Sequence, residues 1–285
     1  DGSCYHMTDI DGNEYQAVQI GEQLWMKENL KTTHYRNGDE VPTGYSDDDW
    51  VNLTTGAYAV YNDDPSNADV YGNLYNWYAV DTGNLAPVGW HVPTDDEWTI
   101  LTDYHGGLSV AGGKLKEQGT EHWVPPNTGA TNESGFTGLP GGFRNGDDGN
   151  YGNMSTNSDY WTSTEDDNNG ASYWGLVWDY SGIFSGSDYK RDGFSVRCIR
   201  NPIPQTILVP QDYPTIQAGI DAASDGDTVL VSAGTYVENI VWSATNGIKL
   251  IGSGEDDCII DGDSLASVIR FEEDLGGIID TNTLI

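Results

Sequence analysis

The pattern of apolar residues changes at "RNPIPQT", residues 200–206, and this change constrains the fold more than any other feature of the chain. Proline lacks a backbone N–H and cannot continue a helix or an inner strand, so the two prolines make residues 202–206 a short, stiff linker. The chain has 285 residues, which is enough for two ordinary domains. We therefore predict one domain over residues 1–201 and another over residues 207–285.

The second domain contains short apolar, β-branched runs at regular intervals. The runs begin roughly ten residues apart with turn residues between them, which is typical of the stacked strands of a solenoid. A helix is expected before them, because "PTIQAGIDAA" places Ile216, Ile220 and Ala223 on one stripe, where they would cover the open edge of the first coil. The runs are "TVLVS" (228–232), "ENIVW" (238–242), "IKLIG" (248–252), "CIIDG" (258–262) and "VIRF" (268–271).

The clearest helix of the first domain begins within "GWHVPTDDEW", residues 89–98. Thr94 is an N-cap residue and Glu97 stands three positions later, as in a capping box. His91 raises the question of a catalytic base or a metal ligand. No second histidine stands at metal-ligand spacing and no motif supplies a nucleophile, so we interpret His91 as a buried imidazole bonded to the backbone. The buried face of the helix is expected to carry Trp98, Leu101 and Thr102.

Elsewhere before the linker, strands are expected to be short and irregular, because Gly, Asn and Asp turns interrupt the apolar runs. One stretch differs from this pattern. In "GNLYNWYAV", residues 72–80, Leu74, Trp77 and Tyr78 stand at helical spacing. We expect a second helix there.

The balance of charged residues excludes one class of partner. The chain has 12 Lys and Arg against 45 Asp and Glu, a formal net charge of −33. Phosphate binding needs a basic stripe, so nucleic acids and anionic membranes are not expected as partners. No apolar run reaches membrane-spanning length, and membrane insertion is not expected either. The acidity fits salt-rich or extracellular surroundings, or carboxylates clustered for Ca²⁺.

Three acidic turns have the oxygen-rich composition of calcium ligands, although none follows the EF-hand pattern. We expect Ca²⁺ at one of them; the alternative is an ordinary solvated surface. The candidate ligands are Asp63 and Asp64 in "YNDDPSNAD" (61–69), Asp147 and Asp148 in "NGDDGN" (145–150), and Asp166 and Asp167 in "EDDNNG" (165–170).

The segment 143–192 is rich in Gly, Asn, Asp and aromatic residues and is the expected binding surface. Sugars present apolar C–H faces rimmed by hydroxyls, so their sites need flat aromatic rings beside polar side chains. The alternative for Trp161, Trp174 and Trp178 is the core, because a strand buries every second residue. The candidate ligand-binding residues are Tyr151, Tyr173, Trp174, Trp178, Tyr180 and Tyr189.

Several phrases of the first domain together resemble one family. They are "DIDGNEYQAVQIGEQLWMKENLKTTHY" (9–35), "YGNLYNWYAV" (71–80), "PVGWHVPTDDEWTILTDYHGG" (87–107), "AGGKLKEQGTEHW" (111–123), "GFTGLPGGFR" (135–144), "YWTSTE" (160–165) and "GFSVRCIR" (193–200). They are similar to the Fibrobacter succinogenes major paralogous domain, whose relatives include the formylglycine-generating-enzyme-like branch of the C-type-lectin fold. The resemblance implies an α+β C-type-lectin-like domain with two helices on a small twisted sheet and long loops on one face. It also implies a secreted or surface-anchored bacterial protein.

The same resemblance bears on the cysteines. Members of the family often carry cysteine where this chain has Ala59 and Ala86, so the usual partner of Cys198 is missing. We expect Cys198 to form a disulfide with Cys4; the alternative is a buried thiol. The oxidase relatives need a reactive cysteine pair in the body of the fold, so their activity is not expected here.

A second resemblance concerns residues 207–242, "ILVPQDYPTIQAGIDAASDGDTVLVSAGTYVENIVW". They are similar to the start of right-handed parallel β-helices of the pectate-lyase type, with a capping helix and a first coil. Lyases on that scaffold use an Arg or Lys base with bound calcium on central coils. Only Lys249 and Arg270 are basic after residue 206, so the resemblance does not imply catalysis in this piece.

These observations favour an extracellular, non-catalytic recognition or adhesion module. A C-type-lectin-like domain on a β-helical stalk would bind glycan or a surface protein through residues 143–192. One alternative is a fragment of a secreted polysaccharide lyase or hydrolase whose β-helix continues beyond this chain. Another is a structural subunit of a surface layer or filament that self-associates through the end of the β-helix.

Overall fold

The computed structural model describes residues 5–201, 203–223, 226–242, 247–254, 257–263, 268–271 and 283–284. The chain divides into two compact units, Asp1–Asn201 and Pro202–Ile285, and the boundary falls beside the first proline of "RNPIPQT". Each unit has its own apolar core. The helices within these residues do not include one that is long and apolar enough to cross a membrane.

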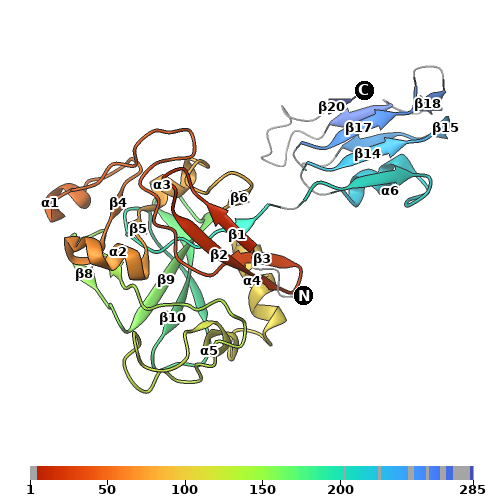
Figure 1. Cartoon of the computed structure of the whole chain (residues 1–285). Helices are drawn as coiled ribbons and strands as arrows, with labels where there is room; N and C mark the ends of the chain where they lie inside the picture. Colours follow the sequence, from red (N-terminus) through yellow and green to blue (C-terminus); the bar gives the residue numbers. More distant parts are fainter. Residues whose placement is uncertain are drawn as a thin grey trace. The chain divides into compact units, whose positions relative to one another are not determined.

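The first unit contains a five-stranded antiparallel sheet near its chain ends (Figure 1). In β2 the buried residues alternate with exposed ones, so Tyr15 and Ala17 enter the core while their neighbours face solvent. The last strand of the unit closes the sheet by pairing Ile199 with both Trp25 and His91. The strand order is β1 (Tyr5–Thr8), β2 (Glu14–Ile20), β3 (Gln23–Met26), β12 (Ile199–Arg200) and β6 (Trp90–His91).

A second sheet is an antiparallel meander of β9 (Asn157–Glu165), β10 (Gly170–Val177) and β11 (Phe184–Tyr189). Successive residues of β10 point to opposite faces. Trp174 and Leu176 enter the apolar core with Tyr160 of β9, whereas Tyr173 is only partly buried on the other face. Gly175 lies on that other face too, in register between Asp159 of β9 and Phe184 of β11.

Helix α4 (Asp95–Tyr104) begins where the capping box predicts it. The Thr94 hydroxyl accepts a hydrogen bond from the Glu97 amide at 3.2 Å, and the Glu97 carboxylate accepts one from the Thr94 amide at 2.8 Å. Trp98, Leu101 and Thr102 are buried, so the predicted core face of this helix is confirmed. The Trp98 ring packs edge-on against Trp25, with the centroids 5.0 Å apart.

The predicted helix over residues 72–80 is wrong in its first half. Leu74–Tyr75 form strand β5, paired with β4 (Tyr58–Ala59), and helix α3 (Trp77–Asp81) begins only after Asn76 caps it. The Tyr75 amide donates to the Phe194 carbonyl at 2.8 Å, so a long-range pairing replaces the first helical turn.

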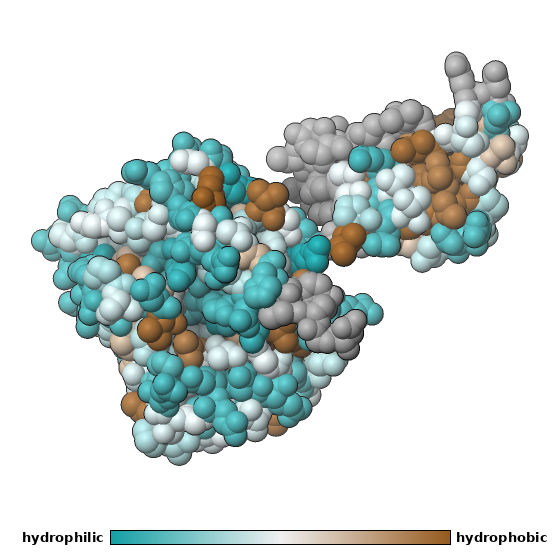
Figure 2. Space-filling model, in the orientation of Figure 1, coloured by the Kyte–Doolittle hydropathy of each residue, from teal (hydrophilic) through white to brown (hydrophobic). Residues whose placement is uncertain are grey.

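The other elements of the first unit are short and are joined by long loops. Their surface is mostly hydrophilic in the view of Figure 2, as the composition predicts. The elements are α1 (Asp47–Trp50), η1 (Tyr61–Asp63), α2 (Pro65–Tyr71), α5 (Ala111–Leu115), β7 (Phe143–Arg144) and β8 (Tyr151–Gly152).

The second unit is built from parallel strands in register. One sheet has the order β13-β14-β17-β20, and two further parallel pairs are β15-β18 and β16-β19. Val209 and Val231 lie opposite each other in the core, where Ile216 and Ile220 of α6 (Ile216–Asp221) join them. The strands are β13 (Thr206–Val209), β14 (Thr228–Val231), β15 (Gly234–Val237), β16 (Ile240–Trp242), β17 (Lys249–Gly252), β18 (Cys258–Asp261), β19 (Ile269–Phe271) and β20 (Thr283–Leu284).

Stacked parallel strands are what the ten-residue spacing predicts for a solenoid. The finer assignments, a right-handed β-helix for this unit and a C-type-lectin-like fold for the first, stay predictions.

Candidate functional site

A cavity of 260 Å³ opens on the outer face of the β9–β11 sheet, and we call it the aspartate pocket. Its lining combines three kinds of side chain: carboxylates, carboxamides and aromatic rings. No Lys, Arg or His lines it. The lining residues are Asp147, Asp159, Asp188 and Asp192; Asn145, Asn153 and Asn157; and Phe143, Tyr173, Phe184, Tyr189 and Phe194.

Gly175 makes the floor of the pocket possible. A Cβ at this position would lie 2.3 Å from Cζ of Phe184 and 2.8 Å from Oδ1 of Asp159, closer than real side chains approach. The absent side chain therefore lets the Phe184 ring and the Asp159 carboxyl approach each other across the middle strand.

Asp159 is 4 % exposed, and its carboxyl makes no hydrogen bond to any residue that the structure describes. Burial, with a smaller contribution from the charge of Asp188, raises the pKa of Asp159 to about 7. An isolated acid in a strand thus becomes a carboxyl that holds its proton near neutral pH.

Asp192 follows the sheet in the turn after β11 and reaches the same cavity. Its Oδ1 accepts a hydrogen bond from the Gly146 amide at 2.5 Å, whereas its Oδ2 is buried without a partner. Burial first, and then the negative charge of Asp188, raises the pKa of Asp192 to about 8. The pocket therefore holds one buried carboxyl without a hydrogen bond among the described residues, Asp159, and one with a single backbone partner, Asp192.

The aromatic residues form one wall of the pocket. Tyr173 packs against Phe184 and Phe194, with ring centroids 6.0 and 5.1 Å apart, and Phe143 meets Phe194 edge-on. Tyr189 is more exposed and lies on the rim. Mutual packing holds these rings in fixed positions, which is what a flat ligand face requires.

Of the six aromatic residues expected to bind ligand, the aspartate pocket brings together two, Tyr173 and Tyr189. The expectation for Trp174 is wrong: it is a core residue, its ring stacks on Trp98, and its Nε1 donates to Asp95 Oδ1 at 2.8 Å. Trp161 is a core residue too. The other three lie apart from the pocket: Trp178 is half-buried against the core, Tyr180 is exposed, and Tyr151 donates its hydroxyl to Asp63 at 2.7 Å.

The acidic turns expected to bind calcium are exposed and mostly serve their own backbone. Asp64 caps α2, Asp148 accepts from the Asn150 amide, and Asp167 accepts from the Asn169 and Gly170 amides. Asp147 pairs with Arg191 at the rim of the aspartate pocket. Asp63 accepts from Tyr151, and Asp166 lies in the turn between β9 and β10. Calcium at these turns stays a prediction.

Within the residues described, three donor groups converge to within 4.8 Å only at Glu117, Glu121 and His122. His122 Nδ1 lies 2.9 Å from the Glu117 carboxylate. These residues could hold a metal ion, and their spacing in "KEQGTEHW" is the signal that sequence analysis passed over.

His91 differs from the expected buried imidazole bonded to backbone. Its side chain is 33 % exposed, its Nε2 lies 2.8 Å from Glu97 Oε1, and its Nδ1 lies 2.7 Å from Asn201 Oδ1. Burial works to raise the pKa of Glu97, but the hydrogen bonds from His91 and Thr94 outweigh it and hold that pKa below its usual value. His91 does not line the aspartate pocket; it braces the start of α4.

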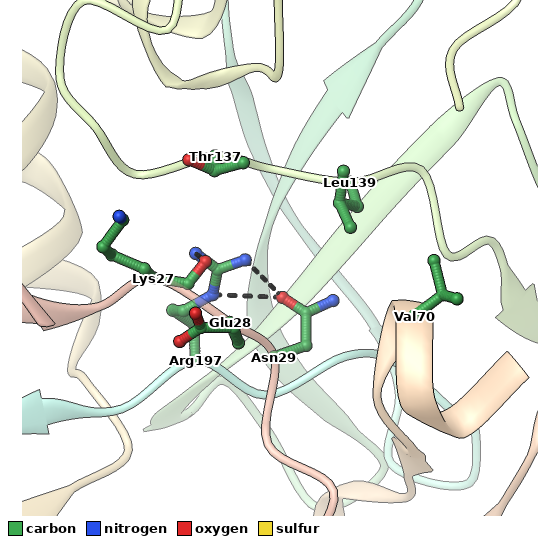
Figure 3. Close-up of a pocket in the computed structure, with 7 residues that line it drawn as sticks. All are labelled: Lys27, Glu28, Asn29, Val70, Thr137, Leu139 and Arg197. Atoms are coloured by element: carbon green, nitrogen blue, oxygen red, sulfur yellow. Dashed lines mark hydrogen bonds between the residues drawn. The ribbon is translucent and has the colours of Figure 1, made fainter. Parts of the chain in front are cut away.

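A second, smaller cavity of 140 Å³ lies over Arg197 (Figure 3). Arg197 is buried, and its Nε and Nη2 donate to Asn29 Oδ1 at 3.0 and 2.5 Å. Its Nη1 donates to the carbonyls of Lys27 and Phe136 at 2.7 and 2.5 Å. The protein itself therefore compensates this cation. The cavity is lined by Lys27, Glu28, Asn29, Val70, Thr137, Leu139 and Arg197.

The expected disulfide is not seen at Cys198. The structure has Cys198 as a free, fully buried thiol, and its expected partner Cys4 lies outside the described residues. Burial raises the pKa of the Cys198 thiol well above its ordinary value, so it does not ionise near neutral pH.

The first unit is thus a small mixed helix-and-sheet domain with an acidic cavity on its β9–β11 sheet. Residues 18–200 match the Fibrobacter succinogenes major domain, and the chain belongs to this family. The match contains every residue that lines the aspartate pocket and ends at the boundary between the two units. Comparison with curated proteins and with solved structures gives no match.

Proposed function

We propose that this chain is a non-catalytic recognition module of a secreted or surface-displayed bacterial protein. Its first unit binds a saccharide in the aspartate pocket, and its second unit is a β-helical stalk that carries the first. The observation that supports this proposal is the composition of one cavity, in which aromatic rings, carboxamides and carboxylates lie together on the face of the β9–β11 sheet.

A pyranose ring offers two kinds of surface, and the pocket has a counterpart for each. The rings of Tyr173 and Phe184 provide an apolar wall for C–H faces. The side chains of Asn153 and Asn157 make no hydrogen bond within the described part of the chain, so both are available to sugar hydroxyls.

The test is a glycan array followed by calorimetry on the best saccharide. Phe184→Ala removes part of the apolar wall and should weaken binding by at least about tenfold, since aromatic contacts of this kind contribute roughly 1 kcal/mol or more. Tyr104→Ala is the matched control, because Tyr104 is 64 % exposed on α4 and lines another part of the surface. Thermal melting establishes that both variants fold. Wild-type affinity in Phe184→Ala, or no binding to any saccharide or cell-wall material, would count against the proposal.

Glycoside hydrolysis is a second candidate, and one observation favours it. Asp159 and Asp192 hold protons near neutral pH, as a general acid must, and both line a cavity of sugar size. Incubation with the bound saccharide should then release reducing ends from the wild type and none from Asp159→Asn. Intact saccharide after prolonged incubation would leave recognition as the function.

A further inference from the structure

The aspartate pocket is lined by four aspartates, and no Lys, Arg or His is among its lining residues. Arg191 pairs with one of these aspartates, Asp147, at the rim, and Lys190 pairs with Glu165. Lys190 also lies 4.8 Å from the ring centroid of Trp77. The carboxyls of Asp159, Asp188 and Asp192 have no ion pair with any residue that the structure describes, and a ligand could supply one.

Two buried carboxyls make this need specific. Asp159 is 4 % exposed without a hydrogen bond among the described residues, and Asp192 is 5 % exposed with Oδ2 unpartnered. A buried polar group without a partner destabilises the folded state, and more so when it is charged. A positively charged donor in the cavity would remove that destabilisation for both carboxyls at once.

The arrangement of these carboxyls does not favour a metal ion. Three side-chain donors come within 4.8 Å of one another at Glu117, Glu121 and His122, and at no other place in the described residues. Three pocket carboxylates therefore do not converge on one point, as a metal site built from carboxylates alone would require. The arrangement of the pocket carboxyls suits an organic cation, in which the charged group is part of a larger molecule.

The other lining residues favour a sugar over a lysine side chain as this organic cation. A lysine would meet the aromatic wall and the carboxylates, but it has no hydroxyl for Asn153 and Asn157. An amino sugar has an apolar ring face, several hydroxyls and one ammonium group, and each has a counterpart in the pocket.

We propose that the saccharide bound by the aspartate pocket carries a free, protonated amine, which is held among Asp159, Asp188 and Asp192. This inference rests on the proposed function and narrows its ligand to amino sugars that are not N-acetylated. The ammonium donates to the unpartnered carboxylate oxygens, and the sugar ring lies against Tyr173 and Phe184.

The test compares two probes on the full chain by calorimetry near neutral pH, where the pocket carboxyls begin to ionise: glucosamine oligomers and the same oligomers fully N-acetylated. Acetylation removes the positive charge and keeps the ring. The glucosamine oligomer should bind at least about tenfold more tightly, because a charge-assisted hydrogen bond is roughly twice as strong as a neutral one and acetylation abolishes it. Added salt should weaken its binding.

Asp159→Asn and Asp192→Asn keep the side-chain shape and remove the charge, so each should reduce the preference for the free amine to near unity. Asp103→Asn is the control, because Asp103 is an exposed acid on α4 outside the pocket. Melting curves of all variants separate folding defects from binding defects.

Equal affinity for the two oligomers would overturn this inference and leave saccharide recognition standing. If the protein bound neither oligomer but bound another, neutral saccharide, the amino-sugar inference would again be overturned and saccharide recognition would stand. Binding of lysine-rich peptides in place of sugars would overturn the amino-sugar assignment, and loss of glucosamine binding on chelation would show that a metal ion fills the pocket. Failure to bind any saccharide would remove the proposed function itself.

Discussion

Arg197 and Asp159 are both buried ionisable residues of the first unit, but the described residues provide hydrogen-bond partners only for the Arg197 side chain. Arg197 donates to Asn29 and to several backbone carbonyls, so its charge is compensated within the protein. Asp159 is buried to a similar degree and receives no hydrogen bond from the residues described. A buried charge with a complete set of hydrogen-bond partners holds loops together, whereas a buried ionisable group without partners beside a cavity marks a candidate ligand-binding site.

The largest expected effect comes from removing the compensated charge. Arg197→Met leaves the carbonyls of Lys27 and Phe136 without donors and should lower the free energy of unfolding by about 3–5 kcal/mol. Denaturant titration measures the change. Arg200→Met is the control, because Arg200 is exposed on the next strand and should change stability by less than about 0.5 kcal/mol. Similar stability in both variants would mean that the partners of Arg197 contribute little.

The next effect concerns the floor of the aspartate pocket. In Gly175→Ala the new Cβ would overlap the Phe184 ring, so we expect a loss of about 1–3 kcal/mol and weaker saccharide binding. Gly141→Ala is the matched control, because a Cβ there would meet its nearest neighbour at an ordinary 3.4 Å. A Gly175→Ala variant that melts with the wild type would show that the Phe184 ring moves aside freely.

Replacing the uncompensated charge should have the opposite sign. Asp159→Asn removes the cost of burying a charge and should raise stability by about 1–2 kcal/mol at slightly alkaline pH. The raised pKa means that the folded protein binds the proton more tightly than the unfolded chain. Stability from this group is therefore full at low pH and is lost as pH rises from about 4 towards the folded pKa of about 7.

Unfolding measured across that pH range checks the prediction. The wild type should lose stability with rising pH more steeply than Asp159→Asn, while Asp192, whose pKa is also raised, contributes in both proteins. Parallel profiles for the two proteins would be inconsistent with an uncompensated carboxyl.

The smallest expected change in stability comes from Glu97, a carboxylate that, unlike Asp159, has hydrogen-bond partners. Glu97→Gln is the same chemical change as Asp159→Asn, but Glu97 accepts hydrogen bonds from Thr94 and His91. We expect a loss of about 0.5–1.5 kcal/mol at neutral pH, because the lowered pKa of Glu97 shows that its ionised form is stabilised. Asp103→Asn should be neutral in the same melting experiment. A gain in stability from Glu97→Gln would contradict the view that hydrogen-bond partners distinguish Glu97 from Asp159.

How far the sequence predicts this molecule depends on the distance between interacting residues. The start of α4 is readable because Thr94 and Glu97 are three positions apart and cap one another. The start of α3 is not, because the Tyr75 amide bonds to Phe194, and a pattern of apolar residues around Leu74 does not reveal that partner. The register of parallel strands in the second unit follows from regular spacing, which is again local information.

The candidate site was only half readable for the same reason. The aromatic-rich segment 143–192 contains most of the residues that line the aspartate pocket, but strand register decides that Tyr173 faces the pocket and Trp174 the core. Asp159 and Asp192 were missed, since isolated acids within "NSDYW" and "KRDGF" belong to no motif. Their importance comes from burial by segments distant in the chain, and it becomes visible only after folding.

The two-residue period of β10 has a consequence for substitutions in the pocket. Its inward side chains Trp174 and Leu176 pack in the core, whereas Tyr173 on its outward face and Phe184 and Asp188 of β11 line the aspartate pocket. Substitutions at Tyr173, Phe184 and Asp188 would therefore change the shape and charge of the pocket while Trp174 and Leu176 keep their places in the core.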